Sequence, residues 1–141
     1  MAAVALAAEQ LGGAQRALDM AVEYAKVRRQ FGRPIGSFQA IKHTLRRPAA
    51  RGRVAAVRGR LRGVARWPRT RPRSRCWPRW SRRTASETYF HVAAENIQIH
   101  GGIGFTWEHD AHLYFKRAKA SELFLGDGAY HRERLANRIG L

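Results

Sequence analysis

The sequence has almost no cysteine and no long apolar run. Its single cysteine, Cys76, has no partner for a disulfide within the chain and cannot form a cysteine metal site. No apolar stretch approaches the roughly 18 residues of a membrane-spanning helix, so we expect no membrane segment. The opening MAAVALAAEQLGG lacks the basic residues of a signal peptide and leads directly into a helical pattern. A cytoplasmic location is therefore expected.

Acidic residues are absent from the middle of the chain. Residues 45–85 contain 15 of the 27 Lys and Arg residues and none of the 10 Asp and Glu residues. Most of the formal net charge of +17 therefore comes from this segment, and the flanks are close to neutral. Four of the five prolines also fall in it, and its arginines recur with neither a helical nor a strand period. We expect an irregular segment there.

The flanks, residues 1–44 and 86–141, have helical periodicity and no convincing strand. A long amphipathic helix is expected over residues 3–29, ending near Phe31 because Gly32 and Pro34 follow. Further helices are expected from Phe38 and over residues 87–98, 109–125 and 129–141. The sequence predicts one all-α domain over residues 1–141, an antiparallel helical bundle in which an Arg/Pro/Trp-rich irregular segment replaces one bundle helix.

The expected inward faces follow from the spacing of apolar residues. They are Val4, Leu11, Leu18, Val22 and Ala25 in the first helix, Phe90, Ala93, Ala94 and Ile97 in the helix at 87–98, and Leu135 and Ile139 in the last helix. Helical spacing over residues 109–125 runs through Leu113, Lys116 or Arg117, Ala120 and Phe124.

Two adjacent glycines, Gly12 and Gly13, interrupt the first helix. Each costs about 1 kcal/mol relative to alanine in a helix interior. Such a cost is reasonable where another backbone packs closely, so we expect a close approach at this point.

Two motifs carry a specific resemblance. RRQFGRPIGSFQAIKH (28–43) and NIQIHGGIGFTWEHDAHLYFKRAK (96–119) resemble the flavin-contacting signatures in the C-terminal helical domain of the acyl-CoA dehydrogenase family. The resemblance covers roughly residues 3–44 and 86–141. It implies a fragment or subunit of an FAD-dependent enzyme that desaturates an acyl-CoA thioester at its α,β bond, in a homo- or hetero-oligomer. The N-terminal helical and β domains of the family are missing from the chain, so we expect no activity and no retained FAD in isolation.

The resemblance also implies the flavin contacts. Arg28 stands where a guanidinium binds the pyrophosphate with charge-assisted hydrogen bonds, and Phe31 where a ring packs on the adenosine. The full set of cofactor-binding candidates is Arg28, Gln30, Phe31, Gln98, Gly101 and Gly102. Two simpler interpretations stay open: Arg28 and Arg29 balance the negative end of the first helix, and the glycine pair caps a helix.

The catalytic base of the family has no counterpart, so we predict no catalytic residue. The usual glutamate position falls on Leu125 and its threonine neighbour on Asp127, while the other position used in the family falls near Ala2. The chain therefore resembles subunits that lack a base and pair with a catalytic partner.

The remaining candidates receive structural interpretations. Phe105 and Trp107 are interpreted as core or interface aromatics. No metal site is expected, because the His109–His112 pair lacks a third ligand, and His91 and His100 do not supply it in a matching pattern.

Three hypotheses account for residues 45–85. The composition is typical of a GC-rich gene read in the wrong frame, and off-frame readings can encode an amphipathic helix with acidic residues. A genuine solvated basic loop is the second hypothesis. The third makes the chain a small nucleic-acid-binding protein, in which Arg residues and Trp67, Trp77 and Trp80 stack on single strands. The flanks without this segment can also serve as an oligomerisation module.

Overall fold

The computed structural model describes residues 2–46, 77–124 and 126–139. The elements are α1 (Ala2–Val27), β1 (Arg29–Gln30), β2 (Arg33–Pro34), the 3-10 turn η1 (Ile35–Ser37), α2 (Gln39–Arg46), α4 (Trp77–His100), the 3-10 turn η3 (Gly101–Phe105), α5 (Ala111–Leu123) and α6 (Gly128–Ile139). The predicted all-α class is confirmed, because the only strands among these residues form a two-residue ribbon. None of the helices described is both long and apolar enough to span a bilayer.

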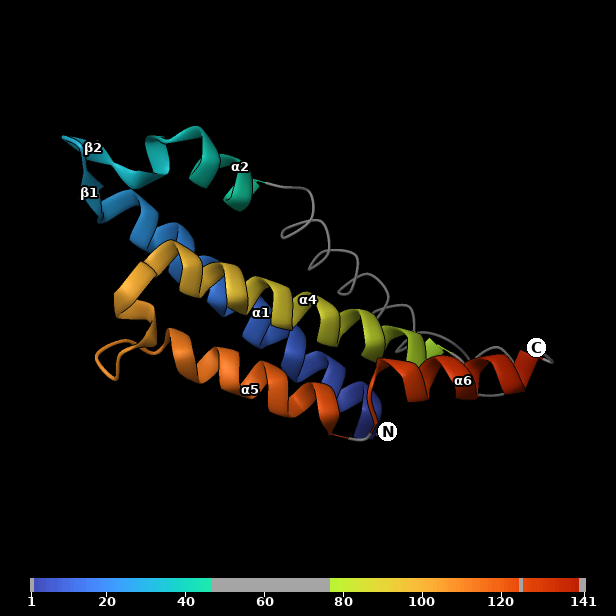
Figure 1. Cartoon of the computed structure of the whole chain (residues 1–141). Helices are drawn as coiled ribbons and strands as arrows, with labels where there is room; N and C mark the ends of the chain where they lie inside the picture. The colour runs from blue at the N-terminus through green and yellow to red at the C-terminus, as the bar shows by residue number, and fades with distance from the viewer. Residues whose placement is uncertain (1, 47–76, 125, 140–141) are drawn as a thin grey trace.

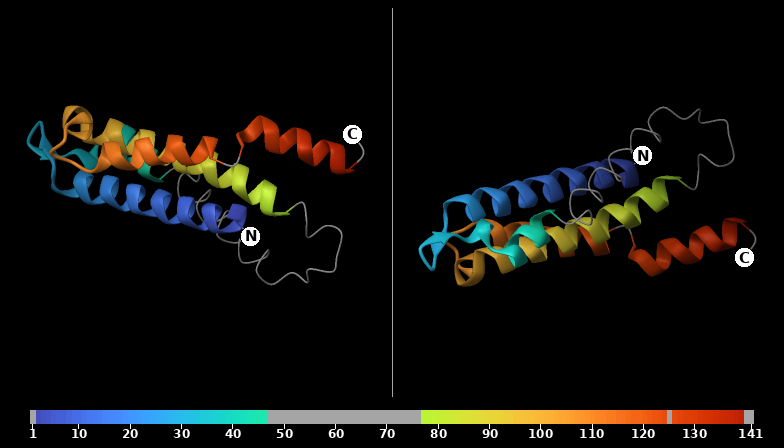
Figure 2. Two further views of the ribbon diagram at one scale, coloured as in Figure 1. Left: turned by 90° about the horizontal axis from the view of Figure 1, so that it is seen from below. Right: turned by 90° about the horizontal axis from the view of Figure 1, so that it is seen from above.

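Helices α1, α4 and α5 lie side by side and form an elongated bundle (Figure 1). Contacts pair Gln10 with Ser86 near one end and Ala25 with Ile99 near the other, so α1 and α4 run in the same direction. α5 returns antiparallel to both. The β1–β2 hairpin and η3 lie at one end of the bundle, and both termini lie at the opposite end in every view (Figure 2). The two motif segments therefore share one end of the molecule.

Small residues line the contact between α1 and α4. Five alanines of α1, at positions 7, 14, 17, 21 and 25, are at most 2% exposed. Ala7 packs with the equally buried Ala85 of α4, and Ala14 packs with Ala93 of the same helix. Of the predicted α1 face, Leu18 and Ala25 are buried, whereas Val4, Leu11 and Val22 are only partly so. Alanine lets two helix backbones approach closely, because only a methyl group stands between them. The buried face of α1 is thus rotated from the predicted one.

The residues whose spacing predicted α5 do not form its buried face. Leu113 and Phe124 are exposed, and the buried positions of this helix are Ala111, His112, Ala118 and Ser121. The spacing predicted the helix, but most of the residues that α5 buries in the bundle are small.

A buried polar cluster joins the three bundle helices. The Gln10 amide of α1 donates hydrogen bonds to the hydroxyl oxygens of Ser86 in α4 and Ser121 in α5, each over 3.0 Å. Ser121 donates in turn to the carbonyl of Ala118. Buried polar groups with partners avoid the cost of desolvation and specify one register of the helices.

The helix predicted over residues 87–98 is longer than expected. α4 begins at Trp77, inside the segment predicted to be irregular, and continues to His100. Pro78 is compatible with this start, because proline in the first turn of a helix removes a backbone N–H that has no intrahelical partner there. At its other end the same segment overlaps α2, which continues to Arg46. Residues 47–76, with Cys76, lie outside the described residues.

The expected approach of another backbone at the paired glycines is wrong: only Gly13 has a close neighbour, and that neighbour is a side chain. A Cβ on Gly13 would lie 2.5 Å from Cζ of Tyr89, whereas a Cβ on Gly12 would meet nothing within 4 Å. The Tyr89 ring is 3% exposed, and burial raises its pKa to about 12. Gly13 therefore makes room for a tyrosine ring of α4.

Candidate flavin-contacting edge

The hairpin after α1 presents three of the candidate residues to solvent. α1 ends at Val27, one turn earlier than predicted, and the ribbon pairs Arg29 with Pro34 and Gln30 with Arg33. The N–H of Ile35 donates to the Arg28 carbonyl over 2.8 Å and closes the base of the hairpin. Arg28, Gln30 and Phe31 are all exposed.

Phe31 has an unusual backbone conformation. Its φ is 53° and that of the next residue, Gly32, is 76°. Glycine adopts this region freely, but a phenylalanine there is strained by contact of its Cβ with the backbone. The Phe31 side chain is 89% exposed and its ring stands edge-on to that of Phe38 at 6.0 Å. The turn thus holds a large apolar ring in water at a conformational cost. Strain of this kind is typical of functional sites, so Phe31 is a candidate contact residue.

The glycine turn η3 carries the other candidates. Gly101 has a φ of 64°, and a Cβ on Gly102 would meet nothing within 4 Å. A Cβ on Gly104, by contrast, would approach the carbonyl of Ile97 to 3.1 Å. Packing inside the chain therefore favours glycine at Gly104, whereas the backbone of Gly102 is bare and open. Gln98, in the last turn of α4, is also exposed.

Three rings are packed in a row at this end of the bundle. Tyr24 of α1 stacks on His100 of α4 with ring centroids 4.2 Å apart, and His109 follows at 4.1 Å. Nδ1 of His100 donates to the Asn96 carbonyl over 2.8 Å, while Nδ1 of His109 accepts the N–H of Ala111 over 3.1 Å. The stack thus joins the ends of α1 and α4 to the loop before α5.

A cavity of about 400 Å³ opens beside the stack. Tyr24, His100 and His109 contribute to its wall, together with the charged side chains of Arg16, Glu23, Glu108 and Asp110. Burial lowers the pKa of His100 from its ordinary 6.5; the hydrogen bond to Asn96 opposes this shift, and the neighbouring His109 adds to it. Burial is the largest of these causes, and it favours the neutral form of the His100 imidazole.

This shift predicts an acid-sensitive fold. In the unfolded chain His100 binds a proton below about pH 6.5, whereas in the folded chain it binds one only at lower pH. The unfolded state therefore binds more protons in this range, and stability falls as the pH drops below about 6.5. We expect the melting temperature to decrease with acidification less steeply in His100→Phe than in the original chain. Thermal unfolding followed by circular dichroism at several pH values measures this, and equal slopes would contradict it.

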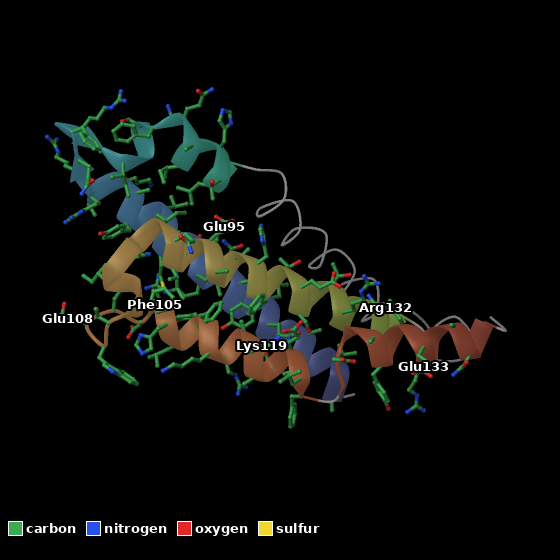
Figure 3. All side chains as sticks on the ribbon, viewed as in Figure 1. Glu95, Phe105, Glu108, Lys119, Arg132 and Glu133 are labelled. Carbon is green, nitrogen blue, oxygen red and sulfur yellow. The ribbon has the colours of Figure 1, made fainter. Side chains whose placement is uncertain are left out.

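Two aromatic residues, Phe105 at the end of the glycine turn and Trp107 after it, lie on the surface. Phe105 and Trp107 are not core residues, since they are 70% and 82% exposed (Figure 3 labels Phe105), and the alternative interpretation as interface aromatics stays a prediction. They reach the surface because η3 and the following loop project from the bundle end. Trp107 instead lies under the ammonium of Lys116 at 4.5 Å.

The histidines form no metal centre in the part of the chain that is described. No group of three or more His, Cys, Asp or Glu side chains there is arranged to bind a metal. His100 and His109 do meet, which their separation in sequence did not indicate.

The region where the family's catalytic base was expected from the sequence is only partly described. Leu125 lies outside the described residues. Asp127 accepts the N–H of Tyr130 over 2.8 Å and thereby caps α6, and Glu122 pairs with Lys119 at 2.9 Å. These two carboxylates near the expected base position have structural partners.

The fold and these two segments define a helical module that presents an exposed guanidinium, an exposed aromatic ring and bare glycine backbone at one end. The family model described as "Acyl-CoA dehydrogenase, C-terminal domain" matches residues 1–140. The chain belongs to this family.

Named relatives agree with the assignment. Acyl-CoA dehydrogenase IpdE2 of Mycobacterium tuberculosis is 50% identical over 124 residues, which cover 88% of this chain and 37% of that protein. Acyl-CoA dehydrogenase FadE34 of the same organism is 44% identical over 132 residues, 89% of this chain and 18% of that protein. The chain thus spans well under half the length of these relatives.

Solved structures agree as well. Butyryl-CoA dehydrogenase from Megasphaera elsdenii superposes with a TM-score of 0.87 at 26% identity, covering 99% of this chain and 36% of that one. The ChsE4–ChsE5 complex from Mycobacterium tuberculosis gives a TM-score of 0.86 at 33% identity, with 98% and 37% covered. The nucleic-acid hypothesis has no support in these findings.

Proposed function

We propose that this chain serves as the flavin-contacting C-terminal domain of an acyl-CoA dehydrogenase that desaturates an acyl-CoA thioester. The observation that carries the proposal is the convergence of two distant segments on one end of the bundle, with their candidate residues facing solvent. Side chains turned outward in this way suit a ligand held mainly by another polypeptide.

The residues present fit the adenosine pyrophosphate half of FAD. Arg28 offers a bidentate guanidinium to the pyrophosphate, and Phe31 offers an exposed ring to the adenosine. Gln30 and Gln98 supply amides that can donate and accept hydrogen bonds. At Gly101 and Gly102 the backbone can approach the ligand closely, because no Cβ intervenes.

The chemistry belongs to the assembled enzyme. Bound FAD supplies a two-electron acceptor for the desaturation of the acyl chain. This chain contributes binding and orientation, and no catalytic base, because the usual position is Leu125. We propose that it works in a homo- or hetero-oligomer in which a partner subunit supplies the base, and that the assembly is cytoplasmic.

Co-expression with the missing domains tests this function. The upstream region of IpdE2, ending where its match to this chain begins, is produced as a separate polypeptide together with the 141-residue chain. We expect a complex that keeps flavin absorbance through gel filtration, whereas the isolated chain purifies colourless. A stable complex without flavin would argue against the proposal, as would equal flavin retention by the upstream domains alone.

A further inference from the structure

The two candidate flavin-contacting segments are connected by one ring contact. Tyr24 stands one turn before Arg28, and its carbonyl accepts the Arg28 N–H over 2.9 Å. The Arg28 carbonyl in turn accepts the Ile35 N–H and closes the hairpin. The base of the hairpin is thus hydrogen-bonded to the residue that carries the Tyr24 ring.

The other half of the contact belongs to the glycine turn. His100 is the last residue of α4 and directly precedes Gly101. Its Nδ1 is bonded to the Asn96 carbonyl, and the turn folds back on it so closely that a Cβ on Gly104 would lie 3.1 Å from the His100 Cβ. The ring of His100 is 5% exposed, so neighbouring atoms hold its orientation.

We propose that the Tyr24–His100 stack is a positioning element that sets the separation between Arg28 on the hairpin and the Gly101–Gly102 backbone on the turn, so that one dinucleotide contacts both. His109 supports the far side of His100 at 4.1 Å and ties the stack to the loop before α5. The hairpin protrudes at the bundle end and its strands are two residues long. Such a short ribbon has little rigidity of its own, so its position depends on what its base is packed against. The proposal rests on the proposed function for its ligand, but the separation itself is a property of this chain.

A distance measurement without flavin tests the positioning role. Spin labels on Arg29→Cys and Phe105→Cys, in the full chain with Cys76→Ser, report the separation of hairpin and turn. Both labelled positions are exposed and lie outside the candidate contacts. We expect a narrow distance distribution in this background, a broad one after Tyr24→Ala or His100→Ala, and a narrow one again in His100→Phe, which keeps a stacking ring. An unchanged narrow distribution in Tyr24→Ala would overturn the proposal.

A second variant, Gly13→Ala, tests whether the broader distance distribution reflects loss of the stack or a general loss of fold stability. Gly13→Ala strains the contact with Tyr89, away from the stack, and is expected to leave the distribution narrow under conditions where the chain stays folded. If Gly13→Ala broadened the distribution as much as Tyr24→Ala, the stack would have only an ordinary structural role and the proposal would fail.

Measuring flavin affinity in the co-expressed complex shows which of the two proposals fails, the positioning role of the stack or the flavin-contacting function of the chain. We expect Tyr24→Ala to raise the dissociation constant of FAD by up to about tenfold and His100→Phe to leave it within a fewfold of the original. If Arg28→Ala has no effect on FAD while Tyr24→Ala broadens the distance distribution, the flavin assignment fails and the positioning role of the stack survives. If Arg28→Ala weakens FAD while Tyr24→Ala changes neither the distance nor the affinity, the positioning proposal fails alone.

Discussion

Replacing Arg28 by alanine is expected to weaken FAD binding by about ten- to a hundredfold in the complex with the upstream domains. Hydrogen bonds to a charged group contribute about 1.5–3 kcal/mol each, and about 1.4 kcal/mol corresponds to a factor of ten in affinity. Arg28 is exposed at the base of the hairpin, so its guanidinium is available to a ligand approaching from outside the bundle. Fluorescence titration of the flavin-free complex with FAD measures the change.

Arg29→Ala is the matched control. Arg29 is the next residue, is also exposed, and pairs through its backbone with Pro34. If the two arginines only balanced the negative end of α1, each substitution would lower stability by about 0.3–1 kcal/mol and neither would change the affinity for FAD. We expect FAD binding to separate the two variants clearly. Equal FAD affinity in both would contradict the assignment of Arg28.

Replacing Gly13 by alanine is expected to lower the free energy of unfolding by about 1–2 kcal/mol. The new Cβ would lie 2.5 Å from Cζ and 2.6 Å from the hydroxyl of Tyr89. The ring cannot easily swing aside, because it is buried in a cluster with Ala14, Ala93 and Ala118. Overpacking of this kind costs about 1–3 kcal/mol, and the better helix propensity of alanine offsets up to about 1 kcal/mol of it. Urea denaturation at neutral pH measures the difference.

The neighbouring glycine supplies a control with the opposite sign. Gly12 lies in the same turn of α1, and an added Cβ there would meet nothing within 4 Å. Gly12→Ala should therefore raise the free energy of unfolding by about 0.5–1 kcal/mol through helix propensity alone. Similar stabilisation in both variants would show that Tyr89 has room to move and that its contact with Gly13 does not constrain the helix.

The helices at the ends of the chain were predictable because each has a local cause. α1 ends before Gly32 and Pro34, and α4 ends at the glycine pair whose first member has a positive φ. Residue type alone limits the backbone at such points. The start of α4 was not predictable in this way, since the Arg- and Pro-rich composition before residue 86 concealed a helix that begins at Trp77.

The buried faces were harder to predict. Sequence periodicity identifies a buried face by the contrast between large apolar and polar side chains. The buried face of α1 consists mainly of alanines and includes the polar Gln10, so this contrast is weak. Leu113 of α5 and Phe124, directly after this helix, lie outside the bundle, whereas Ala118 and Ser121 lie inside. The partner helix decides which side is buried, because small residues allow the closer approach.

By itself, the sequence determined the helical class and the family, and it supplied the candidate residues for FAD and the prediction that Leu125 stands at the usual position of the base. These follow from residue types at fixed spacings, which the chain carries however it folds. Only the tertiary structure decided that the hairpin and the glycine turn meet at one end of the bundle, that Tyr89 packs on Gly13, and that Tyr24 stacks on His100. The physical reason is that these contacts join residues far apart in the chain, so their geometry exists only once α1 and α4 have packed together.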